Sequence, residues 1–326
     1  MLFRSATDFV TEVMGPLARD IESRGIRVIA NAGGVNPHAC RAALQRVFDS
    51  AGVKLRIAVV TGDDLQPHRA AIDAVQQGID DGPTLPTQTL SLNAYLGALP
   101  IALALARGAD VVITGRIADS ALVLGPLLHE FGWSTDDYDR LAQGSLAGHV
   151  IECGAQCTGG NFTDWESVPG YADMGFPIIE CSADGSFVVG KPAGTGGLVS
   201  PLTVAEQILY EIGDPRAYLL PDVVCDFTTV TLDQVGPDSV RVTGARGLPP
   251  TATYKCSATW LDGHRITATF MMGGIDAAHK AAHVAKAILE RVRRLLDERG
   301  LADFRETHVE LLGTETTYGA WARAGA

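Results

Sequence analysis

Long apolar runs are absent from this sequence. The most apolar stretch, Ala98–Ala106, contains Pro100 and ends at Arg107, so it falls well short of the roughly 20 residues that a membrane-spanning helix needs. The N-terminal segment carries Asp8 and Glu12 at positions where a secretory signal would be apolar. Together these absences predict a cytoplasmic protein that has no membrane partner.

Positive charge is also scarce, since 26 Lys and Arg against 38 Asp and Glu give a formal net charge of −12. Nucleic acids and anionic membranes bind to basic surfaces, so we expect neither as a partner. The six cysteines include no C-x-x-C pair, which argues against a zinc ribbon or a disulfide scaffold and favours free, mostly buried thiols. The sequence also lacks the G-x-G-x-x-G turn, followed by an acidic residue about 20 positions later, that is typical of a nicotinamide dehydrogenase.

Helical and strand patterns alternate through the first half of the chain. Apolar spacing and local caps predict helices at residues 6–24, 37–48, 91–107, 121–131, from 134–136 to 146 or beyond, and 203–212. Short apolar runs predict strands at residues 26–30, 55–60 and 110–114, and a hairpin at 177–181 and 186–189. Strands that are apolar throughout and alternate with helices indicate an α/β fold, in which a mostly parallel sheet is covered by helices on both faces. We assign this domain to residues 1–215.

Strand patterns dominate the rest of the chain. Strands are expected at residues 223–231, 239–243, 253–261, 266–271 and 308–312, and one long helix at 277–299. This pattern predicts a smaller α+β unit over residues 216–326, in which several strands pack on one helix.

Each of the first three predicted strands ends in a polar turn that contains glycine. The candidate ligand-binding residues in these turns are Asn31, Gly33, Gly34 and Asn36 after the first strand, Asp63 and Asp64 after the second, and Arg116 and Asp119 after the third. Ligands of open parallel sheets bind beyond the carboxyl ends of the strands, so we expect these turns to converge on one crevice.

The chemistry available at these turns leaves alternatives open. Arg116 is suited to grip a carboxylate or phosphate with two hydrogen bonds, whereas Asp119 fits a base, an arginine partner or a helix N-cap. The adjacent carboxylates of Asp63 and Asp64 suit a metal ion, a general base or a solvated turn.

A second glycine-rich segment, GKPAGTGGLVS at Gly190–Ser200, opens into a predicted helix. Backbone N–H groups freed by glycine at a helix N-terminus form an anion site, to which a lysine adds charge. The candidate anion-binding residues are Lys191, Gly194, Thr195, Gly196 and Gly197. The alternative is a tight structural turn.

His149, Glu152, Cys153 and Cys157 lie within HVIECGAQCTGG and share one face if the segment is helical. Such a face could bind a metal, pair Cys with His as a nucleophile, or supply an acid or base from His149 or Glu152. It could equally be a packed helix end with buried thiols.

Eight motifs occur in a distinctive order, and together they resemble the acyclic terpene utilisation AtuA family. They are NAGGVNP, GDD, NAYLGA, TGRIADSAL, LLHEFGW, GHVIECGAQCTGG, FPIIE and KPAGTGGLV. The resemblance covers the chain from about Ile26 to about Gly313. It implies a place in the breakdown of citronellol- and geraniol-type compounds, whose intermediates are CoA thioesters. Family members usually begin earlier and continue further, so the resemblance also implies a short form of the family or a chain truncated at both ends.

The leading hypothesis is an enzyme of acyclic terpene or branched acyl-CoA catabolism with lyase- or hydratase-type chemistry. His149, Glu152 and Asp119 would supply the acid and base, and the two anion sites would hold the substrate. No cofactor is firmly implied; a CoA thioester is the expected substrate. We expect a homo-oligomer, with room for a small partner subunit. The alternatives are a non-catalytic binding or assembly subunit, and a metal-dependent hydrolase built on Asp63 and Asp64 or on His149 and Cys153.

Overall fold

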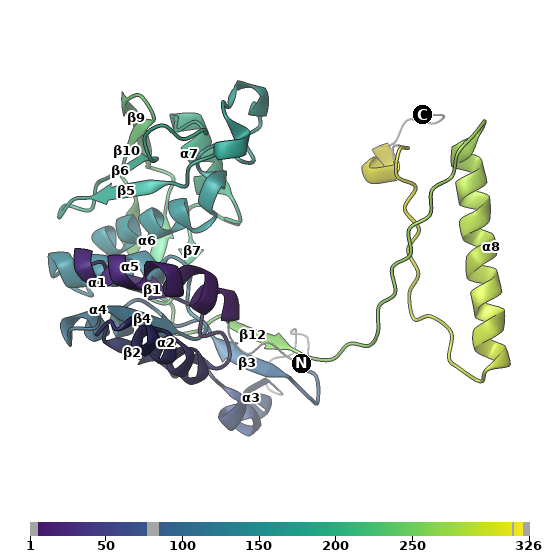
Figure 1. Cartoon of the computed structure of the whole chain (residues 1–326), viewed down its shortest axis with the longest axis horizontal. Coiled ribbons are helices and arrows are strands. Elements are labelled where there is room, and N and C mark those ends of the chain that lie inside the picture. The colour runs from purple at the N-terminus through teal and green to yellow at the C-terminus, as the bar shows by residue number, and fades with distance from the viewer. Residues whose placement is uncertain (1–5, 77–84, 315, 322–326) are drawn as a thin grey trace. The chain divides into compact units, whose positions relative to one another are not determined.

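The computed structural model describes residues 6–76, 85–314 and 316–321. The chain forms two compact units, Met1–Leu261 and Asp262–Ala326 (Figure 1). The boundary expected at residue 215 lies inside the first unit, where strands from both sides of it pair in one sheet. The division into residues 1–215 and 216–326 stays a prediction.

A three-stranded parallel sheet forms the N-terminal part of the first unit. It consists of β1 (Val28–Ala30), β4 (Val111–Thr114) and β2 (Ile57–Val60), in the order β1-β4-β2. These strands confirm the α/β class and the parallel pairing expected from their apolar runs. The other sheets of the described chain are antiparallel, so the expectation of a mostly parallel sheet was too broad.

Helices cover both faces of the parallel sheet. Val111 and Ile113 belong to one hydrophobic core and Val112 to another, because successive side chains of a strand point to opposite faces. The first core contains side chains of a π-helical turn, η1 (Phe9–Met14), and of α1 (Gly15–Arg24) and α2 (Pro37–Ala51). The second contains side chains of α4 (Leu99–Ala106), α5 (Ala121–Phe131) and α6 (Tyr138–Glu152).

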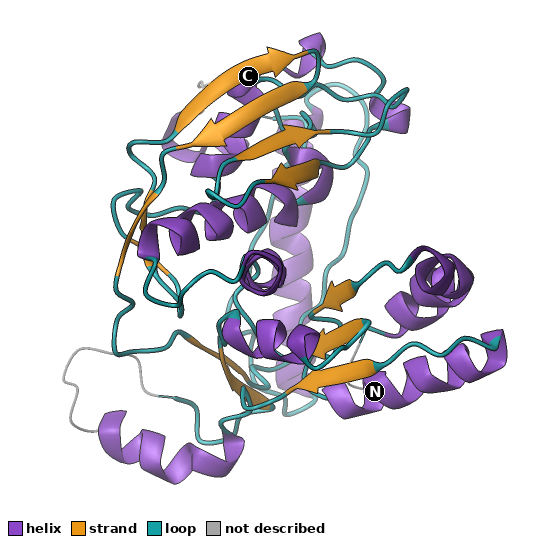
Figure 2. Ribbon diagram, turned by 90° about the vertical axis from the view of Figure 1, so that its left-hand side faces the viewer, coloured by secondary structure: helices purple, strands orange, loops and turns teal. Residues whose placement is uncertain are grey.

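An antiparallel sheet extends the second core. Its order is β5 (Ile178–Cys181), β6 (Phe187–Gly190), β10 (Ser239–Thr243) and β9 (Thr231–Gly236), and it is the larger group of orange strands in Figure 2. The expected hairpin is confirmed as β5 and β6. Phe187, Val189, Val240 and Val242 are buried in one cluster with the side chains of α6 and of α7 (Pro201–Leu209).

The remaining elements of the first unit are short. They are the strands β3 (Ser91–Ala94), β7 (Tyr218–Leu219), β8 (Val224–Asp226), β11 (Arg246–Leu248) and β12 (Cys256–Thr259), the helix α3 (Arg69–Gln76), and the 3₁₀ turns η2 (Gln66–His68), η3 (Gly154–Gln156), η4 (Trp165–Ser167) and η5 (Tyr171–Asp173). The helix expected at residues 91–107 is wrong over its first part, because residues 91–94 form a strand that pairs with β12.

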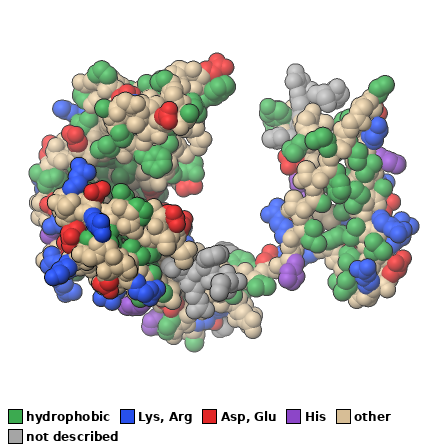
Figure 3. All heavy atoms as spheres, in the orientation of Figure 1, with side chains coloured by type: hydrophobic (Ala, Val, Ile, Leu, Met, Phe, Trp, Pro, Cys, Tyr) green, Lys and Arg blue, Asp and Glu red, His purple; other side chains and the backbone are tan. Residues whose placement is uncertain are grey.

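The second unit contains the helix α8 (Ala277–Glu298) and a 3₁₀ segment, η6 (Thr316–Trp321). The long helix expected at residues 277–299 is confirmed. The strands expected at 266–271 and 308–312 are wrong, since the described part of this unit contains only an isolated bridge between Leu312 and Thr314. No side chain of α8 is buried, and hydrophobic side chains lie on the surface of this unit (Figure 3).

Candidate functional site

The turns after β2 and β4 are joined by Asp63. Its buried carboxylate accepts hydrogen bonds from the side-chain amide of Asn93 at 2.9 Å and from the backbone N–H of Arg116 at 2.8 Å. A Cβ atom on Gly115 would lie 2.5 Å from both carboxylate oxygens, so the close approach requires glycine. Asp63 is therefore occupied in fixing the turn that carries Arg116. Asp64 lies outside this contact, and its carboxylate accepts from the backbone N–H of Gln66 at 3.0 Å.

The turn after β1 contacts the turn after β4. The side-chain amide of Asn31 donates to the Asp119 carboxylate at 3.3 Å. A Cβ atom on Gly33 would lie 2.5 Å from the backbone oxygen of Thr114, so these two turns also approach closely through their backbones. Asn36 acts as the N-cap of α2 by accepting from Ala39 N at 3.1 Å. Gly34 has a φ of 53° in the same turn. The turns at the ends of the three strands therefore contact one another. The ligand crevice expected between them stays a prediction.

The surroundings of Asp119 raise the pKa of its carboxyl group. The N-cap position of α5 is occupied by Ser120, so the Asp119 side chain does not cap this helix and is available for other contacts. Partial burial of the Asp119 carboxyl group raises its pKa above the ordinary value. The negative charge of Glu152 and, more weakly, that of Glu211 raise the pKa further, whereas Arg116 and Lys255 oppose the rise. Asp119 and Glu152, two of the three predicted catalytic residues, therefore lie within electrostatic range of each other.

His149 and Glu152 form a pair at the C-terminal end of α6. His149 is 1% exposed, and its Nδ1 lies 2.9 Å from Glu152 Oε1. Its Nε2 lies 3.2 Å from the backbone oxygen of Ile208 in α7. A carbonyl oxygen only accepts hydrogen bonds, so this partner assigns a proton to Nε2. The Nδ1 contact then requires a second proton, held either by His149 as imidazolium or by Glu152 as a neutral acid.

A second residue of α7 also holds this pair. Gln207 is fully buried and donates its side-chain amide to the backbone oxygen of His149 at 2.9 Å. The Tyr218 ring lies 5.9 Å from the His149 ring, centroid to centroid, and burial raises the pKa of its hydroxyl to about 12. Tyr218 therefore keeps its proton at neutral pH, and the site contains a proton-bearing pair beside an un-ionised phenol.

The two cysteines of the same segment do not form a nucleophile pair with His149. Both ring nitrogens of His149 have other partners, Glu152 and Ile208. Burial raises the pKa of the Cys153 thiol, and it raises that of Cys157 to about 12. The reactive thiolate is therefore disfavoured at both positions near neutral pH.

Two cations lie against one aromatic ring beside this cluster. The guanidinium carbon of Arg116 is 5.1 Å from the centroid of the Tyr95 ring, and Lys255 Nζ is 5.0 Å from it. Sequence reasoning identified Arg116 but missed Tyr95 and Lys255. Tyr95 follows β3 within the NAYLGA motif, so the motif could have identified it as a candidate site residue. Lys255 precedes β12 and reaches the site only because β12 pairs with β3, and no local pattern marks that pairing.

Side-chain and backbone contacts with the rest of the protein hold the Gly190–Ser200 loop in a closed turn. Lys191 Nζ lies 3.1 Å from the Asp238 carboxylate and donates to the backbone oxygen of Thr195 at 2.8 Å. The backbone N–H groups of Thr195, Gly196 and Gly197 donate to protein carbonyl oxygens, while Gly194 has a φ of 78°. Ser200 caps α7 rather than binding a ligand. The loop amides therefore stabilise the turn, and anion binding there stays a prediction.

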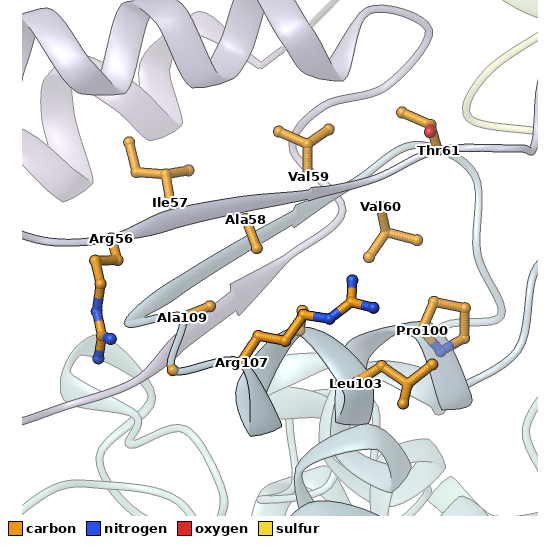
Figure 4. Close-up of a pocket in the computed structure, with 12 residues that line it drawn as sticks. Arg56, Ile57, Ala58, Val59, Val60, Thr61, Pro100, Leu103, Arg107 and Ala109 are labelled. Carbon is orange, nitrogen blue, oxygen red and sulfur yellow. The ribbon is translucent and has the colours of Figure 1, made fainter.

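No group of three or more His, Cys, Asp or Glu side chains that could hold a metal occurs among the described residues. A groove of about 420 Å³ runs along β2, where Arg107, Pro100 and Leu103 of the α4 region lie opposite Val60 and Ala58 (Figure 4). None of the predicted site residues lines this groove. The described helices include none that is long and apolar enough to cross a membrane.

The fold and the cluster together define an α/β protein in which carboxyl, imidazole and cationic side chains gather around the turns after its parallel strands. The family model described as "Acyclic terpene utilisation family protein AtuA" matches residues 6–324. The chain therefore belongs to the AtuA family, as its ordered motifs predicted. No curated protein and no solved structure matches the chain.

Proposed function

We propose that this protein is a cytoplasmic acid–base enzyme of the hydratase or lyase class, and that it acts on branched, α,β-unsaturated acyl thioesters. Membership of the AtuA family implies a role in acyclic terpene utilisation. The observation that carries the proposal is the His149–Glu152 pair, whose hydrogen bonds require a proton between Nδ1 and Oε1. A carboxyl group with a raised pKa, Asp119, accompanies this pair.

The reaction follows from the two carboxyl groups. In the hydration direction, the oxygen of water forms a bond to the β-carbon of the acyl group, and the ionised Asp119 takes the water proton. The electron pair of the carbon–carbon double bond moves to the α-carbon, where it accepts a proton from Glu152. The net change is addition of one water molecule, and elimination is the reverse. The raised pKa of Asp119 suits its role, because a carboxylate of higher pKa is a stronger base.

His149 is a positioning residue in this proposal. Its Nε2–H is held by Ile208, so its Nδ1 faces the carboxyl group of Glu152 in a fixed orientation. The imidazole shares the proton that Glu152 delivers. After each turnover Asp119 releases the proton it took from water to solvent, and the pair regains one from solvent through the partly exposed Glu152. The Glu152 side chain is 18% exposed, so its carboxyl group can meet a substrate while its histidine partner stays buried.

The test is hydration of a branched enoyl-CoA by the purified protein. The loss of absorbance of the conjugated thioester measures the reaction. Glu152→Gln and Asp119→Asn should each lower kcat by about 10²–10⁴-fold, the usual contribution of general acid–base catalysis. Asp64→Asn is the matched control, since Asp64 is also a carboxylate after a strand but lies outside the cluster. Full activity in both site variants would overturn the assignment. Binding without turnover by the wild-type protein would favour the non-catalytic binding subunit instead.

A further inference from the structure

Arg116, Tyr95 and Lys255, here called the cation–tyrosine site, come from three separate turns. Arg116 follows β4, Tyr95 follows β3, and Lys255 precedes β12. Backbone hydrogen bonds hold the turns together: Tyr95 N donates to Lys255 O at 2.9 Å, and Leu96 N donates to Arg116 O at 3.4 Å. The positions of the two cations beside the ring are therefore fixed by the fold.

The two cations of this site are set apart by the ring they share. Some basic residues of the same unit have an acidic partner, as Lys191 does in Asp238 and Arg246 does in Asp139. Neither an ion pair nor a side-chain hydrogen bond connects Arg116 or Lys255 to any described residue; their contact is the Tyr95 ring. Two like charges beside one ring repel each other, and an anion that bridges them would remove that repulsion. The arrangement therefore favours a negatively charged ligand.

We infer that the cation–tyrosine site binds an oxyanion of the substrate, either a carboxylate or a CoA phosphate. This inference rests on the proposed function, since it places the charged end of the substrate beside the acid and base that act on it. The planar guanidinium of Arg116 presents two parallel N–H donors that match a carboxylate or phosphate. Lys255 adds a point charge, and the Tyr95 ring orients both cations through cation–π contacts.

The site also explains how a substrate would be oriented. Arg116 and Lys255 act on the titration of Asp119 with a sign opposite to that of Glu152 and Glu211. Two cations and two acidic residues therefore lie within electrostatic range of Asp119. In the inferred complex the anionic end of the substrate binds the cations, because the carboxylates repel it, and the uncharged acyl carbons face the carboxyl groups. Lys255 is accordingly a specificity-determining residue.

The experiment measures binding to the full chain by calorimetry, without turnover. The probes are a branched acyl-CoA, the matching pantetheine thioester, which has no phosphate, and the matching free acid. Arg116→Gln, Lys255→Gln and Tyr95→Leu should each weaken anion binding at least 10-fold, and Tyr95→Phe should restore it because the ring is kept. The controls Arg41→Gln and Lys54→Gln remove exposed charges elsewhere on the same unit and should bind as the wild type does.

Each outcome has a defined meaning. Binding of the CoA thioester but not of the pantetheine thioester assigns the phosphate, and binding of the free acid assigns the carboxylate. Unchanged affinity in Arg116→Gln and Lys255→Gln, or no anion binding by the wild type, overturns the inference. Glu152→Gln separates the two proposals, because it should bind the probes normally and lose turnover. If Glu152→Gln stays active while the cation variants lose binding, only the proposed reaction is wrong.

Discussion

Asp119 shares its surroundings with carboxylates and cations, and the balance between them decides its protonation. Partial burial and the charge of Glu152 outweigh the attraction of Arg116 and Lys255, so the pKa is raised above 3.8. Asn31 donates to the same carboxylate at 3.3 Å, which fixes its orientation. Different neighbours therefore set the pKa of this carboxyl group and its orientation, and substitutions can change the two properties separately.

The raised pKa of Asp119 predicts the sign of its effect on stability. Between pH 3.8 and the higher folded pKa, the unfolded chain has lost a proton that the folded chain keeps, so stability falls as the pH rises through this window. Asp119→Asn removes the ionisable group and keeps the oxygen that accepts from Asn31. We expect the variant to unfold at a higher temperature than the wild type at pH 7, and the gain to vanish at pH values below 3.8. Thermal unfolding at several pH values measures both effects.

Asp139→Asn should change thermal stability at pH 7 in the opposite direction. The backbone N–H of Gly247 and the Arg246 guanidinium hold the pKa of Asp139 below 3.8. Stability from this group is present above pH 3.8 and is lost as the pH falls through the lower folded pKa. The variant should therefore melt at a lower temperature than the wild type at pH 7. Equal shifts in the two variants would contradict the electrostatic explanation.

At the scale of elements, the C-terminal end of α6 carries the proposed acid and its partner. This helix packs closely on the start of α5 through Gly148, where a Cβ atom would lie 2.6 Å from the backbone Cα and oxygen of Ser120. The neighbouring His149 is held by α7 through Ile208 and Gln207. Any displacement of α6 therefore moves the acid relative to Asp119, which lies just before Ser120.

Gly148→Ala tests this packing. The methyl group has backbone atoms as its nearest neighbours, so α6 must shift, and overpacking of this kind costs about 1–3 kcal/mol of unfolding free energy. Chemical denaturation should show that loss together with a lower kcat, since both catalytic carboxyl groups lose their alignment. The control is Gly15→Ala at the start of α1, where the nearest atoms lie at 3.5 and 3.6 Å. The control should be neutral or stabilising, because alanine favours the helix. Wild-type stability in Gly148→Ala would contradict the predicted contact.

The elements that the sequence predicts well are those with local signals. The strands around Ile29, Val59 and Val112 are apolar throughout, and Gly25 ends α1 with a φ of 64°. The strand at Ser91–Ala94 was predicted as a helix, because its strand structure comes from pairing with β12 more than 150 residues later. Tertiary pairing of this kind overrides local propensity.

The same limit applies to the candidate site. Asp119, Glu152 and Arg116 were found because they stand in turns after strands or on one helical face. Lys255 was missed because only the β12–β3 pairing brings it to Tyr95. The sequence of the Gly190–Ser200 loop is compatible with an anion cradle and with a closed turn. The partner that closes it, Asp238, lies far along the chain.

At the scale of the whole molecule, the two units differ in what stabilises them. Both hydrophobic cores are built from residues between Val10 and Ala245, all within the first unit. In the second unit, no side chain of α8 is buried. Because burial of apolar surface provides most of the stability of a domain, the first unit contains the groups that its own folding requires.

A fragment of residues 1–261 should therefore fold on its own. It keeps both cores, and it keeps Lys255 and β12, so the cation–tyrosine site stays complete. We expect a single cooperative unfolding transition within about 2–4 °C of that of the full chain, a range that corresponds to roughly 1 kcal/mol in a domain of this size. Circular dichroism measures the transition, and calorimetry with the branched acyl-CoA checks the site. A shorter fragment, residues 1–250, is the control. It retains the cores and β11 but removes Lys255 and β12, so it should fold yet lose binding that depends on Lys255. An unfolded 1–261 fragment would show instead that the second unit supplies stability that the cores of the first unit lack.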